Sequence, residues 1–278
     1  MTNAEIAGLY DASDVPPVKN WLYYGYAALM KLFFFVFFGA GSVVLAIVVF
    51  PVVRIFCHPK WRFQRAARAL VSATFRFFLA LLRMFGLVHY SVHDRERFCS
   101  LHSKIVVANH PSLIDVIFII SLIPNADCIV RGGLTRTPLA GVIRQLYIVN
   151  SLDYDEMIAL SKASLATGTN LIIFPEGTRT PRHGTNPYKK GAARIAYETG
   201  CDVQPVYIGG NDKYGLGKHD AFFSFNRTER YRYDIYPLEE IKIAHYAALE
   251  PQRAAKQLTE AMHTAIATAA FNIDGRKV

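Results

Sequence analysis

The chain has 278 residues, of which 52% are hydrophobic and 19% charged, and its 18 glycines and 13 prolines follow no repeat. This composition excludes an intrinsically disordered chain, which contains few hydrophobic residues, and a collagen-like one. The 31 Lys and Arg exceed the 22 Asp and Glu and give a net charge of +9, which favours anionic partners: nucleic acid, anionic lipid or phosphorylated substrates.

Residues 32–53 form an uncharged apolar segment of 22 residues. A helix of about 20 apolar residues crosses a bilayer core, so this segment is long enough to span. It begins after Lys31 and ends before Arg54, which favours a retained anchor over a cleaved signal peptide. Two alternatives remain open: a buried core helix, and a re-entrant hairpin that turns at residues 39–41.

More positive charge follows this segment than precedes it. Arg54, Lys60, Arg62, Arg65 and Arg68 follow, whereas the preceding residues carry both signs. The positive-inside rule therefore predicts that the chain after Arg54 lies in the cytoplasm. If the segment spans the membrane, residues 1–30 face outward.

The next stretch predicts a basic amphipathic helix. On a helix, five arginines fall within an arc of about 120°: Arg62, Arg65, Arg68, Arg76 and Arg83. The opposite side of the helix is apolar and carries Leu70, Phe77, Leu81 and Phe85. Such a helix can lie in the membrane interface with its arginines among lipid phosphates, and the alternative is a helix whose apolar side packs on its own domain. We expect no nucleic acid as a partner, because the stripe adjoins an apolar segment and no nucleic-acid-binding motif is present.

From residue 105 onward, apolar β-rich runs alternate with helical runs. We expect strands at 105–108, 129–130, 147–149, 170–174, 203–208 and 231–236, and helices at 112–122, 156–167 and 247–270. The alternation predicts the α/β class, with a mostly parallel sheet flanked by helices. An N-terminal membrane-associated helical motif precedes this sheet.

A first polar cluster, NHPSLID at 109–115, directly follows the first strand. Pro111 suits the first turn of a helix, which places His110 just outside that turn and Asp115 about one turn in. A carboxylate there can bond one imidazole nitrogen and leave the other nitrogen as a base. The alternative is a capping Asn109 beside a structural histidine.

A second polar cluster, FPEGTR at 174–179, directly follows the strand at 170–174. Gly177 lets the backbone approach a ligand closely, while Glu176 and Thr178 can hydrogen-bond hydroxyl groups. Arg179 can hold a phosphate or carboxylate by two parallel bonds. Both clusters therefore lie at strand ends, where the active sites of such sheets gather.

Together, NHPSLIDV and FPEGTR resemble the glycerolipid acyltransferase family typified by 1-acyl-sn-glycerol-3-phosphate acyltransferase. The resemblance covers roughly residues 104–237. It includes Arg131 with the PLAG sequence at 138–141, the Lys190-Gly191 stretch and the strand around Pro205.

The resemblance implies an O-acyltransferase that moves an acyl chain from acyl-CoA or acyl-carrier protein to a hydroxyl of a lyso-glycerolipid, with lysophosphatidic acid as the leading acceptor. Residues 1–90 would be the membrane anchor and basic helix, and residues 91–278 the acyltransferase catalytic domain. We expect that domain on the cytoplasmic side of the cell inner membrane, beside its anionic lipid surface.

The resemblance also implies roles for particular residues. His110 would be the general base and Asp115 the group that orients it. The substrate-binding residues would be Asn109, Arg131, Glu176, Gly177, Thr178, Arg179 and Lys190. No G-x-S-x-G motif is present, which favours direct transfer without an acyl-enzyme. The four cysteines have no short paired spacing, so we expect no metal and no other cofactor.

One position departs from the family. Many members carry an acceptor-binding arginine where this chain has Ser151, in VNSLDYD. Arg136, Arg144 or Arg182 can substitute for it, or the acceptor differs and is a lyso-lipoamino acid or a glycolipid. A non-catalytic lipid-binding protein and a thioesterase are the remaining alternatives.

Overall fold

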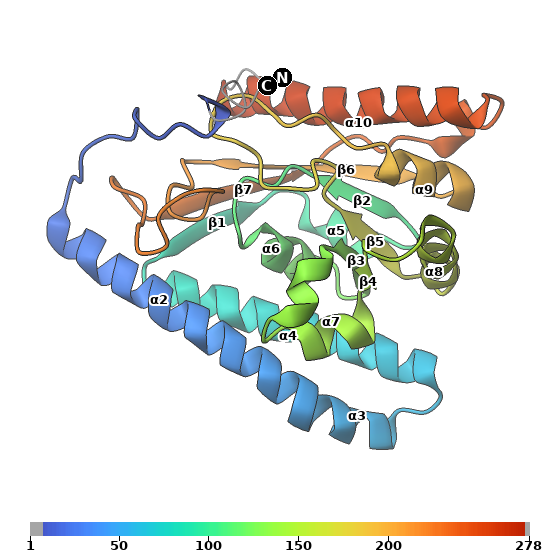
Figure 1. Cartoon of the computed structure of the whole chain (residues 1–278), viewed down its shortest axis with the longest axis horizontal. Coiled ribbons are helices and arrows are strands. Elements are labelled where there is room, and N and C mark those ends of the chain that lie inside the picture. Colours follow the sequence, from blue (N-terminus) through green and yellow to red (C-terminus); the bar gives the residue numbers. More distant parts are fainter. Residues whose placement is uncertain (1–7, 276–278) are drawn as a thin grey trace.

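A seven-stranded sheet organises the chain in the computed structural model, which describes residues 8–275 (Figure 1). The strands are β1 (Val88–Val92), β2 (Ile105–Ala108), β3 (Ala126–Val130), β4 (Ile148–Val149), β5 (Asn170–Ile173), β6 (Val203–Gly210) and β7 (Tyr231–Pro237). Their order is β1-β7-β6-β2-β5-β3-β4, and every adjacent pair is parallel except β6 and β7. The predicted α/β class with a mostly parallel sheet is confirmed.

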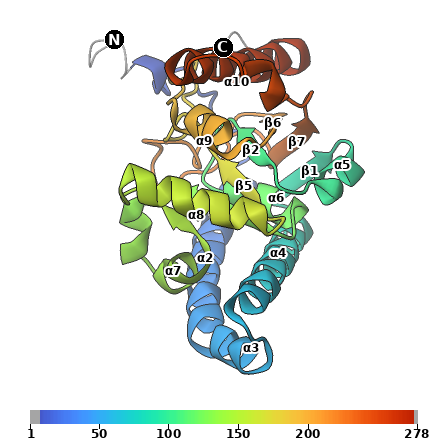
Figure 2. The same cartoon turned by 90° about the vertical axis from the view of Figure 1, so that its right-hand side faces the viewer.

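Helices cover both faces of this sheet (Figure 2). One face packs on α8 (Tyr154–Ala166), α9 (Gly191–Thr199) and α10 (Pro251–Asp274), and the other on α4 (Lys60–Met84), α6 (Asp115–Leu122) and α7 (Ala140–Leu146). Alternate side chains of strand β2 point to opposite faces of the sheet. Ile105 and Val107 pack in the core with α8, α9 and α10, and Val106 and Ala108 pack in the core with α4, α6 and α7. The short helices are α5 (Arg95–Ser100), η2 (Gly132–Arg136) and η3 (Ile243–Tyr246).

The apolar segment lies in one long helical stretch, Trp21–Phe56, made of α2 (Trp21–Val44), η1 (Leu45–Val49) and α3 (Phe50–Phe56). By length and composition it is the one helix of the described residues that qualifies as a membrane span. The alternative of a hairpin that turns at residues 39–41 is wrong, because α2 continues through them. A Cβ on Gly141 would stand only 2.4 Å from the Ala46 side chain, so this glycine permits close packing between the long helical stretch and α7. A Cβ on Gly39 would make an ordinary contact with Pro138, at 3.8 Å.

The long helical stretch is not a core helix either. Large apolar side chains along its outer side are exposed; they include Leu22, Leu29, Phe33, Val36, Val44, Ile47, Ile55 and Phe56. We call these residues the outer stripe. The opposite side buries Ala27, Phe34 and Phe50 against the rest of the protein.

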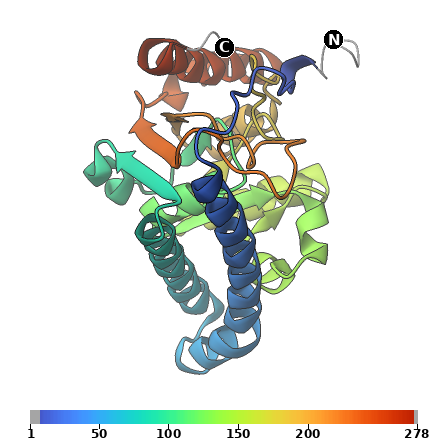
Figure 3. The ribbon, with the colours of Figure 1, turned by 90° about the vertical axis from the view of Figure 1, so that its left-hand side faces the viewer.

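The chain turns after α3 and returns along α4, so that both ends of this helical hairpin lie at the sheet domain (Figure 3). Residues 8–20 also lie on that domain: the Lys19 N–H donates to the Arg227 carbonyl at 2.9 Å, and the His183 N–H to the Leu9 carbonyl at 3.1 Å. Residues 8–20 thus lie on the same domain as the chain after Arg54, which disagrees with the expectation that they face outward if the segment spans the membrane. Residues 1–7 lie outside the described residues.

Helix α4 confirms the predicted helix but divides its arginines. Arg62, Arg65, Arg76 and Arg83 are exposed. Arg68 is buried, and its guanidinium holds Asp127 of β3 in a two-bond pair, Nε to Oδ1 at 2.6 Å and Nη2 to Oδ2 at 2.9 Å. The side that packs within the protein carries Ala67, Val71, Phe78 and Leu82. The predicted apolar side is only partly covered: Leu70 and Leu81 are partly buried, and Phe77 and Phe85 are exposed.

Other element boundaries differ from the predicted ones. Strand β1 and helix α5 were not predicted. The expected boundary between the anchor and the catalytic domain, after residue 90, falls within β1, which pairs with β7 of the sheet. Helix α6 begins at Asp115 rather than at Ser112. The reason is local: the Asp115 carboxylate accepts a hydrogen bond from the Ser112 N–H at 2.6 Å, which holds residues 111–114 in a turn before the helix.

Candidate active site

The two polar clusters meet at the carboxyl edge of the sheet. His110 follows β2 and the FPEGTR turn follows β5, and these strands are parallel neighbours with Val107 opposite Ile173. The rings of His110 and Phe174 lie 4.4 Å apart, centroid to centroid. Two motifs separated by about sixty residues of sequence therefore share one site.

His110 and Asp115 form a hydrogen-bonded pair. The distance between His110 Nδ1 and Asp115 Oδ2 is 2.8 Å; the carboxylate is fully buried, and the imidazole keeps 17% of its surface exposed. An Nδ1–H donated to this carboxylate leaves the lone pair on Nε2. The pair is thus arranged to accept a proton at Nε2 and to stabilise the imidazolium that results.

Further buried groups hold the Asp115 carboxylate in place. Ser112 donates its N–H to Oδ2 at 2.6 Å and its hydroxyl to Oδ1 at 2.5 Å. The Tyr233 hydroxyl of β7 then donates to Ser112 Oγ at 2.8 Å. Burial raises the pKa of Tyr233 well above its ordinary value, so the phenol stays protonated and remains a donor. Sequence reasoning missed Tyr233, whose only signal was its place in an alternating strand.

Glu176 connects the second cluster to the first. Its buried carboxylate accepts from the Thr180 hydroxyl through Oε1 and from Asn186 Nδ2 at 2.8 Å through Oε2. Thr180 exchanges two bonds with the His110 backbone, His110 N–H to Thr180 Oγ1 at 2.8 Å and Thr180 N–H to the His110 carbonyl at 2.7 Å. Burial raises the pKa of Glu176, while its hydrogen bonds act in the opposite sense. Glu176 thus fixes the turn against His110, through partners that sequence reasoning missed.

Arg179 and Gly177 lie in the same turn. Arg179 is half-buried, and its Nη1 donates to the carbonyls of Leu216 at 2.9 Å and Gly217 at 2.8 Å; burial lowers the pKa of its guanidinium. Gly177 has a φ of +66°, and a Cβ there would stand 2.7 Å from Lys189 Nζ. The left-handed φ favours glycine at this position, and the Lys189 ammonium lies close to where a Cβ would stand.

The other predicted residues divide between the interior and the surface. Asn109 is buried and turned inward, because its amide bonds the Ile208 backbone at both ends, at 2.8 and 2.9 Å. Thr178 is half-exposed beside Gly177. Arg131 directly follows β3, Lys190 directly precedes α9, and both are exposed cations.

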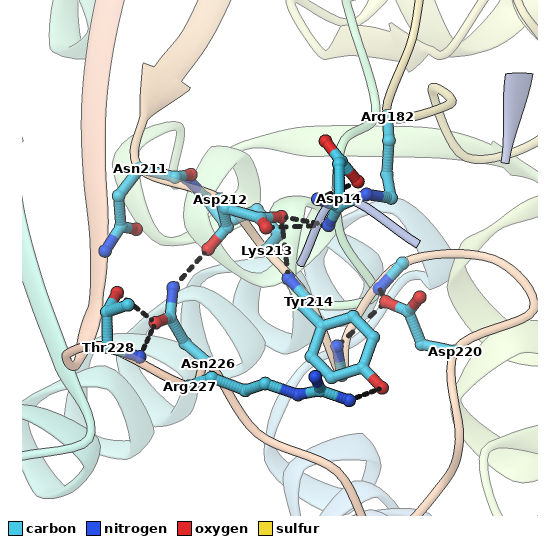
Figure 4. Close-up of polar contacts among 12 residues, drawn as sticks. Asp14, Arg182, Asn211, Asp212, Lys213, Tyr214, Asp220, Asn226, Arg227 and Thr228 are labelled. Carbon is cyan, nitrogen blue, oxygen red and sulfur yellow. Dashed lines mark hydrogen bonds and ion pairs between the residues drawn. The ribbon is translucent and has the colours of Figure 1, made fainter. Parts of the chain in front are cut away.

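The arginines proposed to replace the family's acceptor-binding cation are differently placed. Arg182 is held by carboxylates, with Nη1 2.6 Å from Asp212 Oδ2 and Nη2 3.2 Å from Asp14 Oδ1 (Figure 4). Arg144 donates to the Thr135 carbonyl, and Arg136 is exposed. Within residues 8–275, no group of three or more His, Cys, Asp or Glu side chains is placed to hold a metal ion.

Comparison with known proteins agrees with the geometry. Residues 89–209 match the family model described as Acyltransferase. A 1-acyl-sn-glycerol-3-phosphate acyltransferase of Cocos nucifera is 29% identical over 52% of this chain and 50% of its own length. One of Helicobacter pylori is 31% identical over 38% of this chain and 48% of its own length.

A solved structure shares the fold. The 1-acyl-sn-glycerophosphate (LPA) acyltransferase PlsC of Thermotoga maritima superposes with a TM-score of 0.66, covering 90% of this chain and 98% of that one, at 19% identity. The chain spans about half the length of the curated relatives described above. The resemblance drawn from the two motifs is confirmed.

Proposed function

We propose that this chain, which resembles the glycerolipid acyltransferase family, transfers an acyl group from a thioester donor to a hydroxyl of a lyso-glycerolipid at a membrane surface. One observation carries the proposal. The His110–Asp115 pair leaves Nε2 available beside the turn that bears Arg179, at the carboxyl edge of the sheet.

The chemistry follows from that pair. His110 Nε2 takes the proton of the acceptor hydroxyl as its oxygen attacks the thioester carbonyl, a role that contributes about 10²–10⁴-fold. The buried Asp115 carboxylate stabilises the imidazolium. When the tetrahedral intermediate collapses, the carbon–sulfur bond breaks and the thiolate takes the proton from His110. The products are an ester and a free thiol, and the reaction needs neither a metal nor a prosthetic group.

The cations of the site favour an acceptor with a phosphate. The turn that bears Arg179 bonds the His110 backbone through Thr180, and the Lys189 ammonium lies over Gly177 of the same turn. Arg131 and Lys190 add exposed positive charge. Lysophosphatidic acid is therefore the leading acceptor. Because Ser151 replaces the family's arginine, a lyso-lipoamino acid or a glycolipid is the second candidate. The donor is acyl-CoA or acyl-carrier protein.

The outer stripe supports a position at the bilayer surface. The exposed apolar side chains of the outer stripe, together with the exposed arginines that α4 carries in the same helical hairpin, fit a lipid interface with anionic headgroups. Both ends of the helical hairpin lie on one side, which favours insertion from that side over a crossing. We propose the cytoplasmic face of the inner membrane.

The test uses the full chain in lipid nanodiscs with radiolabelled acyl-CoA, or acyl-carrier protein, and each lyso-lipid. We expect label in a two-chain lipid, and a fall of at least about 100-fold in His110→Ala. His245→Ala, an exposed histidine of η3, is the matched control. Label recovered only as free fatty acid would indicate a thioesterase. An unchanged rate in His110→Ala, or no transfer by the wild type to any acceptor, would overturn the proposal.

A further inference from the structure

Residues 8–20 form an N-terminal strap that joins the two loops bordering the site. At one end, the Leu9 carbonyl accepts from the His183 N–H at 3.1 Å, next to the FPEGTR turn. At the other end, the Lys19 N–H bonds Arg227 in the 211–230 loop at 2.9 Å. Between them, Asp14 pairs with Arg182, which also binds Asp212 of that loop (Figure 4).

Tyr10 is the strap residue that reaches the site. Its hydroxyl lies 3.1 Å from the Arg179 carbonyl and 3.0 Å from Asn186 Oδ1. Asn186 in turn donates from Nδ2 to Glu176 Oε2 at 2.8 Å and to the Arg179 carbonyl at 3.1 Å. The Tyr10 hydroxyl therefore closes a small ring of polar contacts around the turn that bears Glu176 and Arg179.

The ring of Tyr10 is itself held by the 211–230 loop. His219 meets it edge-on at 5.1 Å between centroids, and Lys218 Nζ lies 4.9 Å above its face. A cation at that distance is attracted to the aromatic face. These two contacts restrict the rotamer of Tyr10 in the folded protein, so that its hydroxyl stays within reach of the turn.

From these contacts we infer that the strap is a wall of the acceptor site, and that Tyr10 is a positioning residue that sets the Glu176–Arg179 turn for the acceptor's headgroup. This inference rests on the proposed function. Tyr10 bonds the backbone of Arg179 and not His110, so its loss acts on acceptor binding. The His110 imidazole is oriented by Asp115, which Tyr10 does not contact, so proton transfer changes less than acceptor binding does.

Tyr10→Phe tests the inference, because it removes the hydroxyl and keeps the ring. We expect the acceptor KM to rise about 3- to 10-fold, the size of one lost hydrogen bond, with a smaller change in kcat and an unchanged donor KM. Tyr26→Phe is the matched control: its hydroxyl also donates to a backbone carbonyl, that of Phe85 at 3.0 Å, but away from the turn. A general loss of stability would affect both variants alike.

Two further measurements make the test decisive. If Tyr10 acts through Asn186, Tyr10→Phe should raise the acceptor KM by a smaller factor in an Asn186→Ala background than in the wild type. The effect of Tyr26→Phe should be the same in both backgrounds. Hydrogen–deuterium exchange of residues 176–186 should rise in Tyr10→Phe and not in Tyr26→Phe, independently of activity.

Unchanged exchange and an unchanged acceptor KM in Tyr10→Phe would overturn the inference, as would an equal loss of kcat in both tyrosine variants. If the wild type transfers no acyl group, the proposed function and the acceptor role fail together. The exchange comparison still shows in that case whether Tyr10 holds the turn, so the two failures are distinguishable.

Discussion

Tyr233 lies 121 residues beyond Ser112 in the chain, yet its hydroxyl donates a 2.8 Å hydrogen bond to the Ser112 hydroxyl. Ser112 passes its own hydrogen to Asp115 Oδ1, and Asp115 Oδ2 binds His110 Nδ1. Tyr233, Ser112 and Asp115 are all fully buried. The strand β7 thereby fixes the direction in which the Ser112 hydroxyl points, and through it the carboxylate that orients the imidazole.

Replacing Tyr233 with Phe should lower kcat about 3- to 10-fold while leaving the KM of both substrates unchanged. The Ser112 hydroxyl then loses its donor and can rotate away from Asp115, so the carboxylate stabilises the imidazolium less well. Steady-state kinetics of the variant in nanodiscs measures the change.

Tyr231→Phe is the matched control for this prediction. Tyr231 is buried on the same strand, and its hydroxyl donates at 2.8 Å to the Tyr214 carbonyl rather than toward Asp115. We expect lower thermal stability in this variant and no loss of kcat. An equal fall of kcat in both variants would mean that strand packing, and not the bond to Ser112, governs the rate.

The Arg68–Asp127 pair joins the helical hairpin to the sheet through buried charges. Arg68→Met should lower the free energy of unfolding by about 3–5 kcal/mol, because it leaves the Asp127 carboxylate buried without its counter-ion. Chemical denaturation in detergent measures the loss. Arg65→Met, an exposed arginine one turn earlier, should change that free energy by less than about 0.5 kcal/mol. A loss in Arg68→Met as small as in Arg65→Met would refute a stabilising role for the pair.

Local spacing explains what could be predicted of the site. His110 and Asp115 are only five residues apart, so their contact follows from the backbone between them. The FPEGTR turn follows β5 directly, and neighbouring parallel strands bring it to His110. Such contacts can be predicted because they depend only on the short stretch of backbone between two residues, or on which strands are neighbours in the sheet.

The missed partners depend on distant segments. Tyr10 lies 169 residues from Arg179 and Tyr233 lies 121 from Ser112, and no local pattern says which loop or strand will pack there. Arg68 shows the same limit: helical spacing placed it with the exposed arginines, and only the position of Asp127 on β3 draws it inside. Gly39 could equally have marked a bend, but α2 continues through it.

We expect the outer stripe to be the surface through which the chain binds membranes. The double variant Leu29→Glu/Ile47→Glu should lose binding to vesicles in flotation, because a charged side chain costs about 2.5–3.5 kcal/mol at the bilayer centre and a smaller amount near the interface. Leu160→Glu is the control, since this exposed leucine lies on α8, across the sheet from the hairpin. Equal flotation of the double variant and the wild type would mean that another surface contacts the lipid.

Asp202 lies at the edge of the sheet opposite to the candidate active site, and its pKa predicts that the stability of the fold depends on pH. Partial burial alone would raise its pKa, but hydrogen bonds from Lys104 at 2.9 Å, the Ile243 N–H at 3.0 Å and Lys242 at 3.2 Å lower the pKa to about 2. A folded-state pKa below the unfolded value stabilises the fold at neutral pH, and this contribution is lost as the pH falls from about 4 to about 2. Asp202→Asn should therefore melt below the wild type at pH 7, and the two melting temperatures should converge as the pH approaches 2. A gap that stays constant across this range would show that the charge of Asp202 is not what Lys104 and Lys242 stabilise.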